Sequence, residues 1–182
     1  MLKSSLIALS LTIGFGASSA FAGMMVGGAE MFPAKNIIEN AVNSKDHTTL
    51  VAAVKAAGLV DTLQGAGPFT VFAPTNDAFG ALPAGTVDGL LKPDAKATLT
   101  KVLTCHVVGA KAMSDAVMKM VKDDGGMHKV KTVGGCELTL KYKDGKVMVE
   151  DETGGIATVT IADVAQSNGV IHVIDKVLLP KM

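Results

Sequence analysis

The sequence predicts a single α+β domain, in which a group of short helices precedes a mainly antiparallel sheet. Up to Cys105, apolar residues recur at helical spacing between capping residues and glycines. Further along, apolar and polar residues mostly alternate, and Asp144-Gly145 is a strong hairpin signal between two such runs. Helices followed by hairpin-linked strands are typical of the α+β class. No internal repeat is visible, so one copy of one domain is expected.

The first 22 residues are expected to be a signal peptide. Lys3 gives a positive start, residues 6–15 are mostly apolar, and Ala20-Phe21-Ala22 is a small-x-small cleavage signal. The apolar run is short for a membrane span, and no later stretch is long and apolar enough for one. A secreted or periplasmic product that begins at Gly23 is therefore expected. Residues 23–34, which are rich in glycine and lack periodicity, are expected to form a flexible leader before a single domain over 35–182.

The helical part is expected to contain several short helices. Pro33 can open the first, Asp46 or Thr48 can cap the second, and Gly58 can end it. Further helices are expected over 59–63, over 76–81, near 87–91, after Pro93 and after Ser114.

Strands are expected both within and after this helical part. Residues 69–73 form a short apolar run after the turn Gly65-Ala-Gly-Pro68. The later runs alternate, except for the last, which is almost continuously apolar and is expected to be a central, doubly covered strand. These later strands are expected over 128–133, 137–142, 146–150, 157–161 and 170–174.

Composition argues against a nucleic-acid or anionic-membrane partner. All 17 basic side chains are lysine, and there are 17 acidic residues. Without Lys3 the mature chain would carry 16 lysines and a net charge near −1. Nucleic-acid sites select for arginine forks and a strongly positive patch, and anionic membranes attract a cationic face. The sequence has neither feature.

Three segments together resemble the signature of the fasciclin (FAS1) family. Residues 67–79 (GPFTVFAPTNDAF) resemble the family's first box, 103–108 (LTCHVV) its central Tyr-His motif, and 168–180 (NGVIHVIDKVLLP) its second box. Their order and spacing fit, and the resemblance extends roughly from Asn36 to Pro180. Cys105 departs from the pattern, because the family usually has tyrosine there.

The resemblance implies a β-wedge of two mainly antiparallel sheets flanked by a cluster of short helices. It also implies a role in adhesion or protein interaction, with a protein or cell-surface partner. The residues of the boxes are expected to be structural, and Asp77 and His106 are expected to be buried and hydrogen-bonded. The expected structural residues are Thr70, Phe72, Thr75, Asp77, Phe79, His106, Asn168, Gly169 and His172.

In some animal relatives, an Asp-Ile step before the second box is implicated in integrin contact. Asp163 and Val164 match this step loosely. The other interpretation is that Asp163 caps the turn that leads to Asn168, because aspartate often bonds nearby backbone.

The two cysteines, Cys105 and Cys136, predict a disulfide, because the count is even and an exported protein meets an oxidising compartment. Each is expected at the end of an element, where two segments can approach. The alternative is a pair of free, buried thiols.

No catalytic, cofactor or metal site is expected. His106 and His172 lie among apolar residues without ligand spacing, and 150–152 (EDE) lacks the calcium-loop pattern. Ten methionines, including Met118 and Met120, suggest a periplasmic copper-binding or small-ligand protein as the alternative function. Two classes therefore compete: a non-catalytic adhesion module and a metal or small-ligand carrier.

Overall fold

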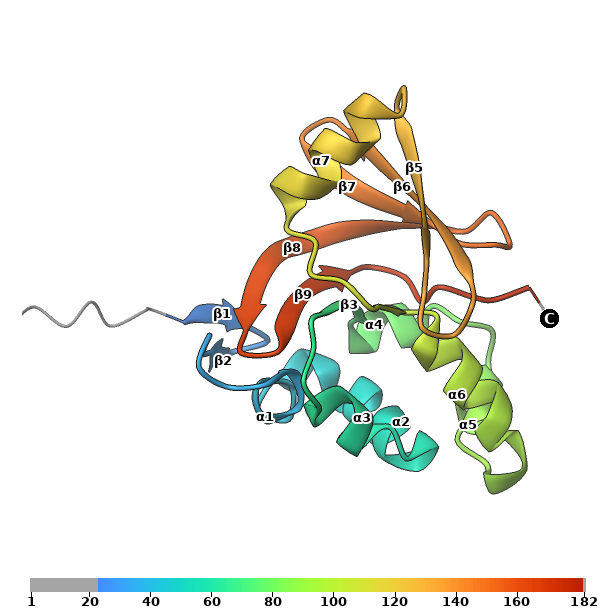
Figure 1. The fold of residues 1–182 in the computed structure, drawn as a ribbon. Helices are drawn as coiled ribbons and strands as arrows, with labels where there is room; N and C mark the ends of the chain where they lie inside the picture. Colours follow the sequence, from blue (N-terminus) through green and yellow to red (C-terminus); the bar gives the residue numbers. More distant parts are fainter. Residues whose placement is uncertain (1–22, 182) are drawn as a thin grey trace, which may run out of the picture.

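A computed structural model describes residues 23–181 (Figure 1). The predicted signal peptide lies outside these residues. Helices and strands are both present, and the predicted α+β class is confirmed. The helices are α1 (Ile37–Ala41), α2 (Thr48–Ala57), α3 (Val60–Gln64), α4 (Asn76–Gly80), α5 (Thr86–Leu90), α6 (Lys96–Thr104) and α7 (Ser114–Asp123). Short 3₁₀ turns, η1 (Lys45–His47) and η2 (Pro93–Ala95), precede α2 and α6.

Seven strands form one strongly bent sheet in the order β4-β3-β9-β8-β7-β6-β5. Only β3 and β9 run parallel among these neighbours; the other pairs are antiparallel. The strands are β3 (Phe69–Pro74), β4 (Val107–Val108), β5 (Met127–Lys131), β6 (Glu137–Lys143), β7 (Lys146–Glu150), β8 (Ile156–Gln166) and β9 (Gly169–Ile174).

The long strand β8 joins the two limbs of this sheet, which are β4-β3-β9 on one side and β7-β6-β5 on the other. Its first residues, 156–158, pair with β7, whereas 159–166 pair with β9 across two register shifts. Such bulges bend a strand and increase its twist. The two sheets of the expected wedge are therefore continuous through one shared strand.

The two outer ends of the sheet approach each other, so that it is nearly closed. Just after β5, the amide of Val133 donates to the carbonyl of Val107 in β4, at 2.7 Å. The next amide, Gly134 N–H, donates to the carbonyl of Thr104 at 3.0 Å. Backbone hydrogen bonds thus connect the segment that follows β5 to β4 and to the end of α6.

Two separate hydrophobic cores lie on opposite faces of the central strands. Helices α1–α6 cover one face, and α7 lies within the bend of the other limb (Figure 1). Val71 and Ile171 belong to the core of the helical side, while Phe72 and Ile174 belong to the core beneath α7. Because β3 and β9 are buried on both faces, their sequences are almost continuously apolar.

The prediction of a leader without regular structure is wrong for residues 24–31. Strands β1 (Met24–Val26) and β2 (Ala29–Met31) form a hairpin, and Val26 and Met31 are each only 1% exposed. Gly27 and Gly28 connect the strands with φ values of 58° and 74°. A two-residue Gly-Gly loop with positive φ is a favoured hairpin connection, and was the signal available in the sequence.

Candidate functional site

The first and last sequence boxes form the two parallel strands at the centre of the sheet. Phe72 lies opposite His172 and Phe69 opposite Gly169 in the β3–β9 register. The rings of Phe72 and His172 stack with centroids 5.8 Å apart. Phe72 and Phe79 are buried, at 1% and 6% exposure, in the two different cores. The structure therefore brings the boxes together as a packing centre.

Asn168 and Gly169 fix the start of β9 against the helical side. The Asn168 side chain accepts a hydrogen bond from the amide of Ile37 at 3.1 Å and donates to the carbonyls of Leu63 and Gly65. A Cβ at Gly169 would lie 2.1 Å from the carbonyl oxygen of Phe69. Only glycine permits this close approach of two backbones.

His106 is a buried residue with both ring nitrogens hydrogen-bonded. Its Nδ1 donates to the carbonyl of Val102 at 2.8 Å, and its Nε2 accepts from the amide of Leu178 at 2.9 Å. This pairing requires the neutral ring, because Nε2 acts as an acceptor. Burial lowers the pKa of His106 to about 4, and the hydrogen bond to Val102 offsets only part of that effect.

His172 is held in the same way with the opposite tautomer. Its Nδ1 accepts from the amide of Asp163 at 3.2 Å, so Nε2 carries the proton and donates to the carbonyl of Ala112 at 2.8 Å. Burial lowers the pKa of His172 as well. Each imidazole joins backbone segments that are distant in sequence.

The two box threonines bond to backbone groups. Thr70 donates to the carbonyl of Ala110 at 2.5 Å and accepts from the amide of Ala112 at 2.9 Å, which fastens the segment before α7 to β3. Thr75 is the N-cap of α4, and its hydroxyl accepts from the amide of Ala78.

The expectation that Asp77 is buried and hydrogen-bonded is wrong. Asp77 is exposed in the first turn of α4. Its neighbour Asn76 carries the bonds instead: it accepts from the amide of Thr49 at 3.0 Å and donates to the carbonyl of Lys45 at 2.8 Å. The physical reason is the phase of α4, which turns Asn76 toward α2 and Asp77 toward solvent.

The structure places Val164 in the core and Asp163, which is partly exposed, beside the start of α7. Val164 is 0% exposed. Asp163 has a φ of 61°, at the second register shift of β8, and its carboxylate accepts bonds from the amide of Ser114, at 2.6 Å, and from the Ser114 hydroxyl. Asp163 therefore caps α7 from 49 residues away, and not the turn before Asn168 as the alternative interpretation held.

Cys105 and Cys136 form a disulfide, as predicted, with their Cα atoms 5.4 Å apart. The bond lies next to the two backbone hydrogen bonds that bring the sheet ends together. It therefore links the end of α6 to the start of β6 and encloses α7 and β5.

Two buried polar clusters were missed from the sequence. Asp151 is 7% exposed and accepts hydrogen bonds from the amides of Thr153, Gly155 and Leu179. The spacing of Asp151 and Thr153, typical of a side-chain turn, could have indicated the local part. Asn40 bonds both backbone groups of Phe32 and the side chain of Gln166, a long-range contact that leaves no local signal.

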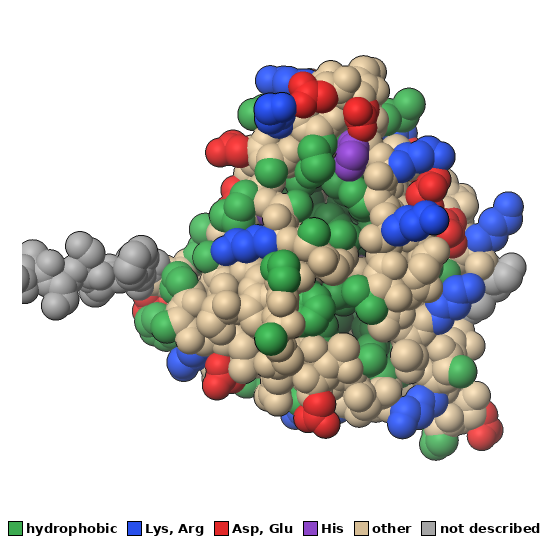
Figure 2. Space-filling view, in the orientation of Figure 1, with side chains coloured by type: hydrophobic (Ala, Val, Ile, Leu, Met, Phe, Trp, Pro, Cys, Tyr) green, Lys and Arg blue, Asp and Glu red, His purple; other side chains and the backbone are tan. Residues whose placement is uncertain are grey.

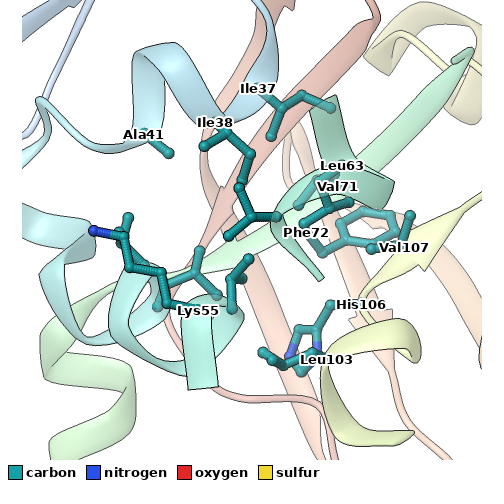
Figure 3. A pocket seen from close by; sticks show the side chains of 14 residues that line it. Ile37, Ile38, Ala41, Lys55, Leu63, Val71, Phe72, Leu103, His106 and Val107 are labelled. Carbon is teal, nitrogen blue, oxygen red and sulfur yellow. The ribbon is translucent and has the colours of Figure 1, made fainter. Parts of the chain in front are cut away.

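A narrow apolar crevice lies between α1–α3 and the β3–β4 region (Figure 3). Ile38, Val71, Leu103 and Val107 contribute to its walls, and the Lys55 ammonium points away from them. Its volume is about 30 Å³, which is room for little more than a water molecule. The polar atoms of His106 are already bonded, so the crevice is a packing feature and offers no reactive group.

Within residues 23–181, no three His, Cys, Asp or Glu side chains gather in a way that could hold a metal ion. Over the same residues, no helix has the length and apolar character needed to cross a bilayer.

The fold and its sequence boxes define a fasciclin-type domain, and comparison with known proteins agrees. The model of the fasciclin domain matches residues 45–180. A solved FAS1 domain pair from the insect cell adhesion molecule fasciclin I superposes with a TM-score of 0.57 at 25% identity, over 71% of this chain and 43% of that one. This chain belongs to the fasciclin domain family.

Bacterial and animal relatives share this domain. Protein sll1483 of Synechocystis is 53% identical over 149 residues, which are 82% of this chain and 76% of the relative. Cell surface glycolipoprotein MPB83 of Mycobacterium bovis is 39% identical over 67% of this chain and 48% of its own length. Transforming growth factor-beta-induced protein ig-h3 of Sus scrofa is 39% identical over 72% of this chain, but only 17% of its own length.

Proposed function

We propose that this chain is an exported, non-catalytic adhesion or protein-interaction module that binds a protein or cell-surface partner. One observation carries the proposal. The polar box residues that could perform chemistry, His106, His172 and Asn168, use their side-chain nitrogens and oxygens to bond the domain's own backbone. The boxes build the scaffold, and its exterior is left for recognition.

The relatives support the same class. One is described as a cell surface glycolipoprotein and another structure comes from a cell adhesion molecule. The start of the sequence, with Lys3, an apolar run and Ala20-Phe21-Ala22, supports export.

The exterior itself suits contact with a partner. In the face shown in Figure 2, apolar side chains gather over the middle of the molecule, and lysines and acids lie mostly around its margin. Protein-binding surfaces commonly combine an apolar centre with a polar rim.

A binding experiment tests the proposal. Fluorescently labelled mature protein, beginning at Gly23, is added to intact cells of its source and to their isolated envelopes. Saturable binding that unlabelled protein displaces is expected, and protein unfolded by reduction and heat serves as the control. Binding that never saturates, or that the unfolded control reproduces, would contradict the adhesion function.

Export is tested separately by sequencing the N-terminus of protein recovered from periplasm and medium. A start at Gly23 is expected. Accumulation of the chain with Met1 intact in the cytoplasm would contradict export.

A calorimetric titration of the same mature protein with copper tests the competing proposal, a metal or small-ligand carrier. Tight stoichiometric binding of copper would favour the metal carrier.

A further inference from the structure

The last strand of the bent sheet, β5, has an open edge. It pairs with β6 on one side, and among the described strands no ladder joins its other side to β4 (Figure 1). The two ends of the sheet are bridged just beyond β5, where the amide of Val133 donates to the carbonyl of Val107. Along β5 itself the sheet is therefore not closed.

This edge carries backbone groups without partners. In an antiparallel pair, successive residues alternate between bonding the partner strand and pointing away from it. The amide of Thr132 donates toward the β6 side, to the carbonyl of Cys136, and the next amide, that of Val133, points outward to β4. The same alternation turns outward the N–H and C=O groups of Met127, Lys129 and Lys131. Within residues 23–181 these outward groups have no hydrogen-bond partner.

The segment that follows β4 does not bond this edge, because it is fastened elsewhere. Thr70 of β3 bonds the carbonyl of Ala110 and the amide of Ala112. His172 of β9 donates to the carbonyl of Ala112. The connection from β4 to α7 is thus fixed to β3 and β9, and it leaves β5 unpaired.

The two faces of β5 differ in chemistry. Lys129 and Lys131 are exposed on the outer face. Val130 points to the opposite face and lies at the margin of the core beneath α7, as do Met120 of α7 and Val108 of β4; all three are only partly buried. A strand added to this edge would meet lysines on one face and apolar side chains on the other.

The lysines disfavour a second copy of this chain as the added strand. In the centred antiparallel register of two β5 strands, Lys129 would lie opposite Lys129 of the other copy, and like charges in that position are destabilising. Lysine on an edge strand is a known device against self-association. An acidic strand would instead be attracted. Lys129 is already paired with Glu137 at 2.7 Å, but Lys131 forms no ion pair with any described residue.

We propose that the open edge of β5 binds an extended segment of a partner protein in which acidic and apolar residues alternate. The segment's backbone pairs with the outward groups of β5, its acidic side chains lie beside Lys129 and Lys131, and its apolar ones extend the core beside Val130. Addition of a strand to a free edge is an established mode of peptide recognition. This inference rests on the proposed adhesion function and deepens it, because it assigns the kind of segment that is bound.

Hydrogen exchange measured by NMR tests the pairing directly. The probe is a capped peptide of alternating glutamate and valine, with about six residues, the usual length of a strand. It is added to the mature, disulfide-bonded protein. In the free protein, the amides of Lys129 and Lys131 should exchange fast, whereas those of His128 and Val130, which face β6, should exchange slowly. The peptide should slow exchange at 129 and 131 about tenfold or more. Protection at alternate residues distinguishes an added strand from mere contact with the surface.

Substitutions separate the backbone contribution from the charge contribution. Lys131→Glu is expected to weaken peptide binding about tenfold, and the same reversal at the exposed Lys92 of the helical half should change nothing. Lys129→Pro removes an outward amide while keeping the bonds to β6, since proline is tolerated on edge strands. It should abolish binding, whereas Lys129→Ala, which keeps the amide, should retain most of it. Thermal melts check that both variants are folded.

Several outcomes would overturn this inference. One is peptide binding that survives N-methylation of the glutamates and, in a second peptide, of the valines, because backbone pairing needs one of these two sets of amides. Another is equal binding of a lysine–valine peptide. A third is a dimer in sedimentation whose 129 and 131 amides are protected without peptide, since a second copy would then occupy the edge.

The binding of labelled protein to cells separates this inference from the proposed function. Lys129→Pro should reduce that binding and Lys129→Ala should not. If the peptide fails to bind while saturable cell binding persists in both variants, the strand site is refuted and the adhesion function stands. If the native protein does not bind cells, the adhesion function is refuted as well.

Discussion

The helical half, residues 23–105, and the strand half, residues 106–181, are stabilised in different ways. Apolar contacts and polar side chains that bond backbone dominate the first, and no ion pair forms within it. All four ion pairs of the described residues lie between Lys119 and Glu150, on α7 and strands β5–β7. Surface ion pairs contribute little each, so the ladders and the small core beneath α7 must hold the second half.

The seam between the halves, where β3 pairs with β9, is the region that we expect to tolerate the least change. Strands β3 and β9 contribute to both cores, and His106 and Asn168 connect backbone of the two halves. If this comparison is right, substitutions at the seam should unfold the whole domain together, whereas substitutions at the periphery should have small effects.

The largest effect is expected for Gly169→Ala. The new Cβ would lie 2.1 Å from the Phe69 carbonyl, a backbone atom that cannot move aside. We expect a loss of more than about 4 kcal/mol of unfolding free energy, measured by denaturant titration. A single transition would show that the halves unfold as one unit, and a biphasic one that they are independent.

Gly89→Ala is the matched control. Gly89 lies within α5, and a Cβ there would meet nothing within 4 Å. Alanine should stabilise that helix by about 0.5–1 kcal/mol. Equal stability of Gly169→Ala and the native protein would refute the close approach of β3 and β9.

The disulfide should have the next largest effect, because it is the covalent tie between the halves. The cysteines are 31 residues apart, and a closed loop of that length stabilises by about 3–4 kcal/mol in the chain-entropy description. We expect the Cys105→Ala/Cys136→Ala variant to lose that amount in denaturant titrations. Addition of reductant should destabilise the native protein but not the variant, and a native protein indifferent to reductant would contradict this role.

Acid should destabilise the seam through His106. Its pKa is about 4 in the folded protein and near 6.5 in the unfolded chain. Below pH 6.5 the unfolded chain binds a proton that the native state excludes, so stability falls as pH falls and levels off below about pH 4. The total is about 3 kcal/mol, and His47 and His172, whose pKa values burial also lowers, act in the same direction.

Thermal melts between pH 8 and 4 measure this effect, together with NMR titration of the His106 ring. A His106 ring that titrates near pH 6.5 in the folded protein would contradict the explanation.

Local patterns in the sequence predicted most helices and the alternating strands, because apolar periodicity and caps depend on nearby residues. The disulfide was predicted from the even cysteine count and the expected oxidising compartment. They did not predict partners that are distant in the chain. Asp163 caps α7 across 49 residues, and Asn168 holds α1 across 131. The Gly27-Gly28 hairpin was missed although its signal was local, since strands of three residues are too short to show periodicity.

The smallest effects concern Asn76 and Asp77, two neighbours in the first box, of which Asp77 was expected to be the buried, hydrogen-bonded residue. Asn76→Ala removes bonds that hold the start of α2 to α4 and leaves the amide of Thr49 and the carbonyl of Lys45 without these partners. Because the site is partly exposed, water can replace part of this bonding, and a loss of about 1–2 kcal/mol is expected. Asp77→Ala removes only an exposed charge in the first turn of a five-residue helix, and should cost about 0.5 kcal/mol or less.

Denaturant titrations of the two variants in parallel compare their losses of unfolding free energy. Addition of salt should shrink the Asp77 effect and leave the Asn76 effect unchanged, because only the first is a screened charge interaction. A larger loss for Asp77→Ala than for Asn76→Ala would mean that the carboxylate, and not the amide, joins the box to α2, and that the helical half depends on charge as much as the strand half does.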